Sequence, residues 1–318
     1  MSISSLKLSQ NRAVNEILAA PDVAVVHGPP GTGKTTTLVQ AVRLLCETEA
    51  TVLVTAPSNT AVDLLTERLA EQELRVVRIG NISRMDENIV RHTLEARLSE
   101  HPESKTVKKI KIQAADARRQ ARRYRRSFGR EEARERREQH QEARELEAWA
   151  NQLESRMVDE ILSGAQVITC TLVGAAHSEL RGRKFRTVVI DEAAQALEPA
   201  TWIPIAKASR VVLVGDPFQL PPTVKSVEAR RRGLGVTLIE KCLQRLPRVS
   251  LLDEQYRMHE TIMGFSNRRF YDNALRAAEG VRTHRLTAGE NDPLVFIDTA
   301  GCGFEEKVHE RFQSRFNP

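Results

Sequence analysis

The segment from Gly28 to Thr35 combines glycines, a lysine and a hydroxyl side chain at the spacing of a phosphate-binding loop. It fits the pattern G-x-x-x-x-G-K-[ST], in which the glycines let backbone N–H groups wrap around phosphates. Lys34 would reach the β and γ phosphates, and the Thr35 hydroxyl would bind Mg²⁺. The alternative is a glycine-rich turn before a helix. The residues expected to contact the nucleotide are Gly28, Pro29, Pro30, Gly31, Thr32, Gly33, Lys34, Thr35 and Thr36.

A pair of acidic residues, Asp191 and Glu192, follows the short apolar run 187–190. A phosphate-binding loop needs an acidic partner at the end of a neighbouring strand. Asp191 would hold Mg²⁺ through water, and Glu192 would orient and deprotonate the water that attacks the γ phosphate. An acidic pair after a strand is common, so it has weight only together with the loop. These two motifs alone indicate a nucleoside triphosphatase and no more.

Short apolar runs alternate with helical patterns around these residues. Such alternation predicts an α/β fold with a parallel sheet that helices cover on both faces. Residues 23–27 form a strand candidate just before the glycine loop, and 61–69 has the apolar spacing of a helix. The other strand candidates are 51–55, 75–79, 166–169, 187–190 and 210–214.

The region from about 104 to 162 departs from this rhythm and predicts an inserted antiparallel helical hairpin with a turn at 127–130. Its arms carry apolar residues at heptad spacing, and the arginine-rich first arm would lie beside glutamates of the second. The expected seam residues are Val107, Ile110, Ala114, Ala117, Ala121, Tyr124 and Phe128, then Ala143, Leu146, Ala150, Leu153 and Met157; the expected glutamates are Glu131, Glu132, Glu135 and Glu138. A solvated, salt-bridged stalk and a direct nucleic-acid contact both fit, and mixed charge favours the stalk.

A second α/β unit is predicted to start near residue 234. Residues 234–243 and 260–270 read as helices, and 249–252 and 294–297 read as strands. About 85 residues are fewer than a full nucleotide-binding lobe commonly needs. Asn317 and Pro318 resemble the start of a helix. We therefore expect a fragment of a longer protein, the alternative being a frayed natural tail.

Charge and cysteine spacing limit the class of protein. The 318 residues carry 48 Lys and Arg against 42 Asp and Glu, a net charge of +6 that suits an anionic partner. The four cysteines are far apart and form no C-x-x-C pair, which argues against a zinc site or a disulfide framework and for a reducing cytoplasm. Neither a signal peptide nor a membrane-length apolar run is present, so no membrane partner is expected.

Two further segments, 214–222 with Gly-Asp-Pro-Phe-Gln-Leu-Pro-Pro and 252–259 with Gln-Tyr-Arg-Met, are similar to motifs of superfamily 1 helicases. The resemblance is to subgroup B, which includes the nonsense-mediated-decay helicase and the immunoglobulin-mu-binding helicase. Segment 56–63 resembles the family's motif Ia, 169–175 its nucleic-acid-contacting segment and 191–195 its motif II. The match runs from about Leu8 to the last residue. It implies a RecA-like P-loop fold.

The resemblance also implies roles around ATP. Gln10 matches the family's adenine-reading glutamine, although a surface glutamine before a helix has the same local pattern. Gln219 matches the glutamine that senses the γ phosphate. Tyr256 stands where the family stacks an aromatic ring on adenine, and a buried core ring is the alternative. Arg257 stands where an arginine reaches the γ phosphate across the cleft, so the catalytic set is Lys34, Glu192, Gln219 and Arg257.

Three more residues match family positions that touch the nucleic-acid backbone: Asn59, Thr60 and Thr171. Small amide and hydroxyl side chains at strand ends suit phosphate and sugar contacts, which position a strand without reading its sequence. The same residue types are also ordinary helix caps and turn formers. The resemblance to the helicase family favours the nucleic-acid role for these three residues.

Together these observations predict an ATP- and Mg²⁺-dependent helicase or translocase that moves along single-stranded DNA or RNA, by resemblance 5′ to 3′. Residues 1–230 would form the first RecA-like lobe with the hairpin, and 231–318 an incomplete second lobe. We expect a cytoplasmic monomer, with room for protein partners that load it. The accessory β-barrel and the later second-lobe motifs are not visible, so full activity of this chain alone is doubtful. The alternatives are an AAA-type remodelling ATPase and a half-motor that binds ATP and nucleic acid as a regulatory protein.

Overall fold

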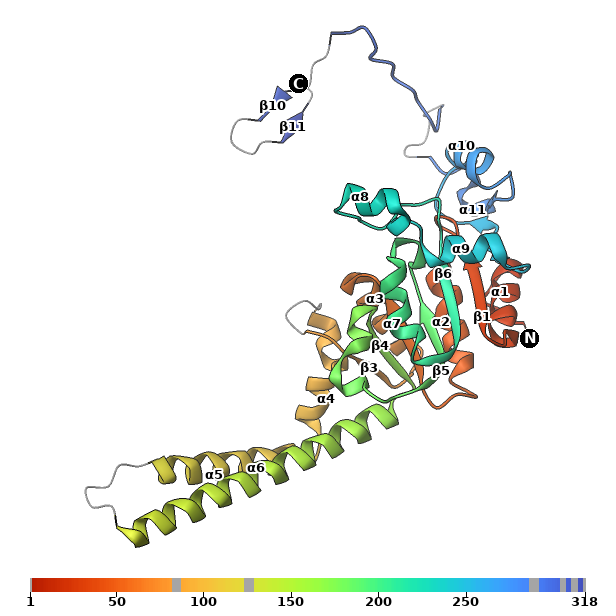
Figure 1. The fold of residues 1–318 in the computed structure, drawn as a ribbon. Coiled ribbons are helices and arrows are strands. Elements are labelled where there is room, and N and C mark those ends of the chain that lie inside the picture. Colours follow the sequence, from red (N-terminus) through yellow and green to blue (C-terminus); the bar gives the residue numbers. More distant parts are fainter. Residues whose placement is uncertain are drawn as a thin grey trace. The chain divides into compact units, whose positions relative to one another are not determined.

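The computed structural model describes residues 2–81, 87–122, 129–285, 292–303, 307–309 and 314–316. The chain divides into two compact units, Met1–Asp253 and Glu254–Pro318. The first unit holds a sheet flanked by helices (Figure 1). All of its paired strands are parallel, in the order β3-β4-β2-β5-β6-β1-β7. Its strands are β1 (Val23–His27), β2 (Val52–Ala56), β3 (Val76–Arg78), β4 (Val167–Thr171), β5 (Phe185–Ile190), β6 (Ala208–Gly215) and β7 (Ser250–Leu251).

Helices cover both faces of this sheet, as its strands require, because residues on both sides of each central strand are buried. The helices are α1 (Leu8–Ala19), α2 (Lys34–Leu45), α3 (Asn59–Ala70), α4 (Leu94–Glu100), α5 (Ser104–Arg122), α6 (Arg130–Gly164), α7 (Glu198–Ile205), α8 (Val227–Ala229) and α9 (Leu238–Arg245). Short 3₁₀ helices are η2 (Glu87–His92), η3 (Val173–Ala176), η4 (Ser178–Leu180) and η5 (Ala193–Gln195), and η6 (Arg230–Leu234) is a π-helical turn. The predicted α/β parallel fold is confirmed.

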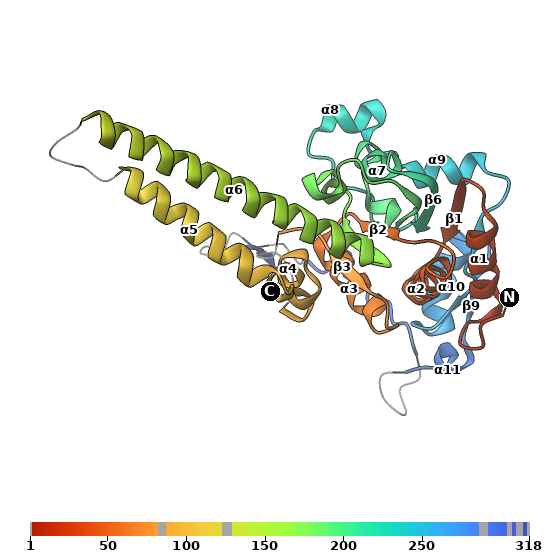
Figure 2. The same cartoon turned by 90° about the horizontal axis from the view of Figure 1, so that it is seen from below.

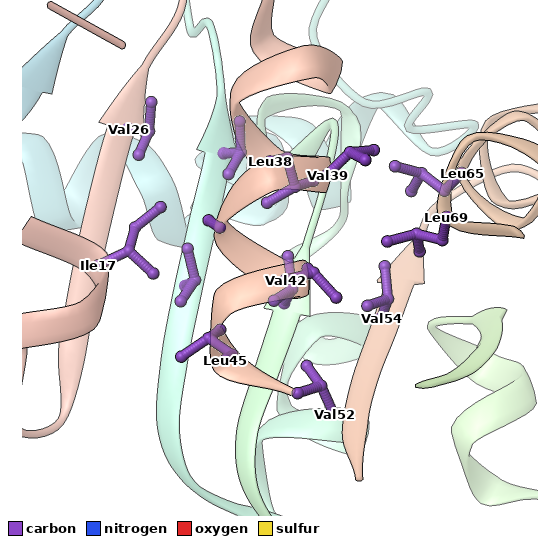
Figure 3. Packing of buried hydrophobic residues seen from close by; sticks show 14 of the residues in the cluster. Ile17, Val26, Leu38, Val39, Val42, Leu45, Val52, Val54, Leu65 and Leu69 are labelled. Atoms are coloured by element: carbon purple, nitrogen blue, oxygen red, sulfur yellow. The ribbon is translucent and has the colours of Figure 1, made fainter. Parts of the chain in front are cut away.

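The core has two layers, one on each face. On one face α1, α2 and α3 pack against the sheet, and Figure 3 shows Leu38, Val42 and Leu45 of α2 at its centre. On the other face, residues from α9, the 3₁₀ helices and the end of α6 pack against the opposite side of the strands. Helix α2 is thus held firmly behind the loop that precedes it.

Helices α5 and α6 lie side by side as the predicted antiparallel hairpin (Figure 2). The seam residues of α5 within the described range are buried, and α6 contributes Ala143, Ala150, Leu153 and Met157. Leu146 is half-buried. Ser127 and Phe128 of the predicted turn at 127–130 lie outside the described residues, as does Tyr124, whereas Arg130 is already the first residue of α6. The hairpin leaves the sheet beside α4 and returns at Gly164, just before β4 begins.

Among the described residues, the ion pairs between the two arms are not the expected ones. Lys111 pairs with Glu154, and Arg118 pairs with Glu147. Residues further along α5 therefore pair with residues that come earlier in α6. In this register Glu131, Glu135 and Glu138 lie further out than the described part of α5, and Glu138 pairs with Arg134 of its own helix. The side chain of Glu132 lies outside the described residues. The apolar seam between α5 and α6 sets this register, and the charges alone do not predict it.

The second unit contains α10 (Glu260–Phe270), α11 (Glu279–Arg282), and the short strands β8 (Glu254–Gln255), β9 (Arg276–Ala277), β10 (Lys307–Val308) and β11 (Arg315–Phe316). Met263, Tyr271 and Leu275 form its small apolar cluster. The strand predicted at 294–297 is not formed. No described strand pairs with this segment, and Leu294, Val295, Phe296 and Ile297 are exposed.

Two elements that we expected to open a second α/β unit lie in the first unit instead. Helix α9 packs on the first sheet, and β7 pairs in parallel with β1. The backbone N–H of Leu252 donates to the carbonyl of His27, which ties the chain to that sheet. The lobe boundary at residue 230 itself stays a prediction.

The described helices and the four cysteines bear on the expectations of no membrane partner and of a reducing environment. None of the described helices has the length and apolar character needed to cross a membrane. The four cysteines are free thiols, and burial raises the pKa of Cys170 to about 12 and that of Cys46 to about 11. A cytoplasmic location stays a prediction.

Candidate functional site

The carboxyl ends of the parallel strands bring most of the predicted site residues to one edge of the sheet. The glycine loop follows β1, Asp191 and Glu192 follow β5, and Gln219 lies just beyond β6. Asn59 follows β2, and Thr171 is the last residue of β4. Open α/β sheets bind their ligands at this edge. The sheet topology therefore makes one candidate site from segments far apart in sequence.

The glycine loop has the backbone shape that phosphate binding needs. Gly31 and Gly33 have φ values of 77° and 78°, in the left-handed region that favours glycine. The Thr32 hydroxyl donates to the Pro29 carbonyl at 2.7 Å and closes the loop. Thr35 and Thr36 then stand in the first turn of α2, whose N-terminal N–H groups attract anions.

Lys34 lies folded across the loop. Its Nζ donates to the Gly28 carbonyl at 2.8 Å, and a Cβ atom added at Gly28 would stand only 2.2 Å from the Lys34 Cγ. The residue at position 28 must therefore be glycine for the lysine stem to pass. An ammonium group beside a glycine loop suits a polyphosphate.

Gln10 is buried against this loop. Its Nε2 donates to the Thr32 carbonyl at 3.1 Å, and its Oε1 accepts from the Lys7 N–H at 2.9 Å. A Cβ atom at Gly33 would stand 2.6 Å from Gln10 Nε2. The surface alternative for Gln10 is wrong, and its adenine-reading role stays a prediction.

Asp191 is buried at the end of β5, and its Oδ1 accepts the Glu192 N–H at 2.9 Å. Burial, and then the charge of Glu192, raise the pKa of Asp191 to about 6, while that hydrogen bond and Lys34 oppose the rise. Glu192 has φ of 50°, a left-handed conformation that is rare outside glycine. Such strain is typical of functional turns.

These side chains fit a Mg²⁺ site. The Thr35 hydroxyl and the Asp191 carboxylate are oxygen donors, which Mg²⁺ prefers, and a buried acid with a raised pKa is stabilised by a nearby cation. Among the described residues, no cluster of three or more His, Cys, Asp or Glu forms an all-protein metal cage. A Mg²⁺ ion here would complete its shell with waters and phosphate oxygens.

Gln219 is held by a buried carboxylate that the sequence analysis did not single out. Gln219 Nε2 donates to Asp216 Oδ2 at 2.9 Å, and the Phe218 N–H donates to Asp216 Oδ1 at 3.1 Å. The Nε2 atom of His27 lies 3.0 Å from the same Oδ1. Two signals could have pointed to this cluster, since Asp216 belongs to the 214–222 segment and His27 directly precedes the glycine loop.

The predicted nucleic-acid residues lie at or just after the ends of two neighbouring strands, β4 and β2. Thr171 pairs in register with Ala56, and its hydroxyl oxygen accepts the Gly174 N–H at 3.0 Å. Asn59 is half-buried and Thr60 exposed in the first turn of α3, which Ser58 caps by accepting from the Ala61 N–H. Their contact with nucleic acid stays a prediction.

Tyr256 and Arg257 belong to the second unit. The buried Gln255 organises their turn, since its Oε1 accepts the N–H groups of Arg257 and Met258, both at 2.8 Å, and its Nε2 donates to the Met258 carbonyl. Tyr256 is 38% exposed, so the alternative of a buried core ring is wrong. Their approach to a nucleotide stays a prediction.

The chain is similar to known proteins over nearly its whole length. A family profile described as an AAA domain matches residues 5–227, and a second AAA-domain profile matches 234–318. The DNA-binding protein SMUBP-2 of Mesocricetus auratus is 36% identical over 333 residues, covering 99% of this chain and 33% of the relative. The DNA polymerase alpha-associated DNA helicase A of Schizosaccharomyces pombe is 34% identical, covering 97% of this chain and 47% of the relative.

The regulator of nonsense transcripts 1 homologue of Drosophila melanogaster is 32% identical, covering 94% of this chain and 24% of the relative. The chain thus spans about a third of the length of the SMUBP-2 relative and about half that of the helicase A relative. The solved arterivirus non-structural protein 10 helicase, in complex with DNA, covers 85% of this chain and 44% of its own, at 13% identity and a TM-score of 0.43.

Proposed function

The chain belongs to the AAA-domain family of superfamily 1 helicases, and we propose from this premise that it hydrolyses ATP to move along single-stranded nucleic acid. One observation carries the proposal. The sheet topology brings the glycine loop, the Asp191–Glu192 pair and Gln219 to the same edge of the first unit. A loop that holds phosphates, an acid that holds a cation and a base are the parts that phosphoryl transfer to water requires.

In this proposal each side chain has one task. Backbone N–H groups of the loop and the Lys34 ammonium bind the β and γ phosphates. Thr35 and Asp191 hold Mg²⁺, which neutralises phosphate charge when bound. Glu192 takes a proton from the attacking water, and Gln219 senses the γ phosphate. Gln10 and Tyr256 bind the adenine, and Arg257 stabilises the charge on the γ phosphate.

Asn59, Thr60 and Thr171 would contact the backbone of the strand. They lie at or just after the ends of β4 and β2, and β2 also pairs with β5, the strand that leads into Asp191 and Glu192. The printed names of the relatives include a DNA-binding protein, a DNA helicase and a regulator of nonsense transcripts. The proposal covers DNA and RNA alike, with movement 5′ to 3′ as the resemblance implies.

The test is the ATP hydrolysis rate of the 318-residue chain with and without single-stranded DNA and RNA. We expect a strand to accelerate hydrolysis and Lys34→Ala to abolish it. Lys184→Ala is the matched control, since Lys184 is exposed and bonds the Ala206 carbonyl near the opposite edge of the sheet. Hydrolysis that ignores strands would favour the remodelling ATPase. Strand binding that survives Lys34→Ala without any hydrolysis would favour the half-motor.

A further inference from the structure

The side chain of Arg78, at the end of β3, is fully buried and makes contacts that no motif predicts. Its Nε donates to Asp63 Oδ1 at 2.9 Å, its Nη1 donates to the Ile79 carbonyl, and its Nη2 donates to Asn59 Oδ1 at 3.0 Å. A buried guanidinium is costly unless such acceptors surround it. Arg78 therefore satisfies its own requirements inside the protein and does not reach the surface.

The contact with Arg78 fixes which way the Asn59 amide points. A guanidinium has only donors, so the Asn59 atom that faces it must be the carbonyl oxygen Oδ1. The NH₂ group of the same amide is then turned away from Arg78. Asn59 is half-buried in the first turn of α3, so part of its side chain is accessible while Oδ1 is bonded to Arg78.

Asp63 keeps this arrangement neutral and rigid. It lies four residues after Asn59 on α3, so both side chains stand on one face of the helix and meet the same guanidinium. Asp63 is 3% exposed and pairs with the charge of Arg78. The fork of Arg78 thus links α3 to the end of β3 through two directed bonds.

Thr171, at the end of β4, has a hydrogen-bond donor as well. The Thr171 hydroxyl oxygen accepts the Gly174 N–H at 3.0 Å, and the hydroxyl still has its own proton to donate. Thr171 ends β4, and Asn59 begins α3 just after the neighbouring strand β2, so two side chains with N–H or O–H donors lie at the same edge of the sheet. Phosphate oxygens only accept hydrogen bonds, so this polarity suits a nucleic-acid backbone.

We propose that Arg78 is a positioning residue for strand binding: it holds the Asn59 amide with the NH₂ group outward, ready to donate to a backbone oxygen of the nucleic acid. The inference rests on the proposed function and adds to it a residue that never touches the strand. The class of ligand is an acceptor-rich polymer backbone, single-stranded DNA or RNA. Without Arg78 the amide is free to turn its carbonyl outward and repel the phosphate.

The decisive variant is Asn59→Asp. The carboxylate keeps the bond to Arg78, now as an ion pair, but replaces the outward NH₂ group by an oxygen. Fluorescence anisotropy with labelled single-stranded DNA and RNA should show affinity falling by about tenfold or more. The melting temperature should not fall, and nucleotide affinity should stay within about twofold. Unchanged strand affinity would mean that Asn59 serves only to satisfy Arg78, and would overturn the inference.

Added negative charge alone must be separated from the loss of a donor. Ser58→Asp is the matched control, because it adds the same charge one residue away and keeps a capping oxygen for α3. Strand affinity should fall clearly less in Ser58→Asp than in Asn59→Asp. An equal fall in the two variants would reduce the effect to Coulomb repulsion and sink the proposed orientation.

A second series tests Arg78 directly. Arg78→Lys keeps the charge beside Asp63 but cannot reach Asn59 and Ile79 with a planar fork, so strand affinity should fall severalfold while nucleotide binding persists. In the background of Asn59→Ala, the same change should cost no further strand affinity. If the two substitutions lowered strand affinity additively, Arg78 would not act through Asn59, and the inference would be overturned. If the wild-type chain binds no strand, the proposed function fails as well; if it binds and Asn59→Asp binds equally, only the inference about Arg78 fails.

Discussion

The Nε2 atom of His27 lies 3.0 Å from Oδ1 of Asp216, joining the last residue of β1 to the first residue after β6. Asp216 is 1% exposed and also accepts bonds from the Phe218 N–H and from Gln219 Nε2. One carboxylate thus ties the segment that contains Gln219 to the base of the glycine loop. A displacement of either segment would therefore move the other through the Asp216 carboxylate.

Asp216→Asn should therefore weaken strand-stimulated hydrolysis while leaving nucleotide binding nearly intact. The neutral amide cannot accept from all three donors at once, so Gln219 loses its fixed position. Loss of a hydrogen bond to a charged group, about 1.5–3 kcal/mol, corresponds to about a 10- to 100-fold lower stimulated rate. Asp22→Asn, at the exposed start of β1, is the control. A variant whose stimulated rate equals that of the wild type would show that Gln219 does not depend on Asp216.

Glu192→Gln should trap bound nucleotide. The substitution keeps the size of the side chain and the backbone turn after β5, but glutamine cannot take a proton from water. We expect hydrolysis to fall by about 10² or more, with nucleotide affinity equal to or higher than that of the wild type. Single-turnover hydrolysis and equilibrium nucleotide binding measure the two quantities. Glu100→Gln, at the exposed end of α4, serves as control, and normal turnover in Glu192→Gln would remove the assigned base.

The part of the site that follows local pattern was predictable from sequence, and the part that depends on distant partners was not. The strand before Gly28, the loop and α2 share one continuous pattern. Residues 249–252 have the pattern of a strand, yet nothing local says that the Leu252 N–H bonds the His27 carbonyl in the first sheet. Arg78 interrupts an apolar strand, which signals a buried charge but not its acceptors on α3. Contacts with residues far away in the sequence determine these parts of the structure, and no local pattern shows those contacts.

The acid–base behaviour of Asp191 gives a prediction for the metal-free protein. Burial and the charge of Glu192 raise its pKa from 3.8 to about 6. A raised carboxyl pKa means that the folded state holds the proton more tightly than the unfolded state does. Its contribution to the free energy of unfolding is thus complete below about pH 4 and is lost as pH rises through 6.

Asp191→Asn should remove this pH dependence. At pH 7, in EDTA, urea unfolding should show the variant more stable than the wild type by about 3 kcal/mol, which corresponds to the rise in pKa from 3.8 to about 6. Near pH 4 the difference should vanish. The same variant should lose Mg²⁺-dependent nucleotide binding, because a neutral amide is a poor ligand for Mg²⁺. A stability difference that does not change between pH 4 and 7 would contradict the buried, destabilised carboxylate.

The hairpin should tolerate damage without loss of the nucleotide site. Ala143 is 1% exposed on the face of α6 that packs against α5, so Ala143→Asp places a charge in the seam and opens the outer hairpin. Limited proteolysis should then cut within 104–162 faster than in the wild type. Nucleotide affinity should not change, because α6 ends at Gly164, just before the amino end of β4, away from the glycine loop.

The same variant separates the two interpretations of the hairpin. Lys111 and Arg118 already pair with Glu154 and Glu147 across the arms, which favours a salt-bridged stalk over a nucleic-acid contact. We therefore expect Ala143→Asp to bind single strands as the wild type does. Ala148→Asp, exposed on the same helix, adds the same charge without entering the seam and should resist proteolysis. Strand affinity that falls in Ala143→Asp but not in Ala148→Asp would assign the hairpin a direct contact with the strand.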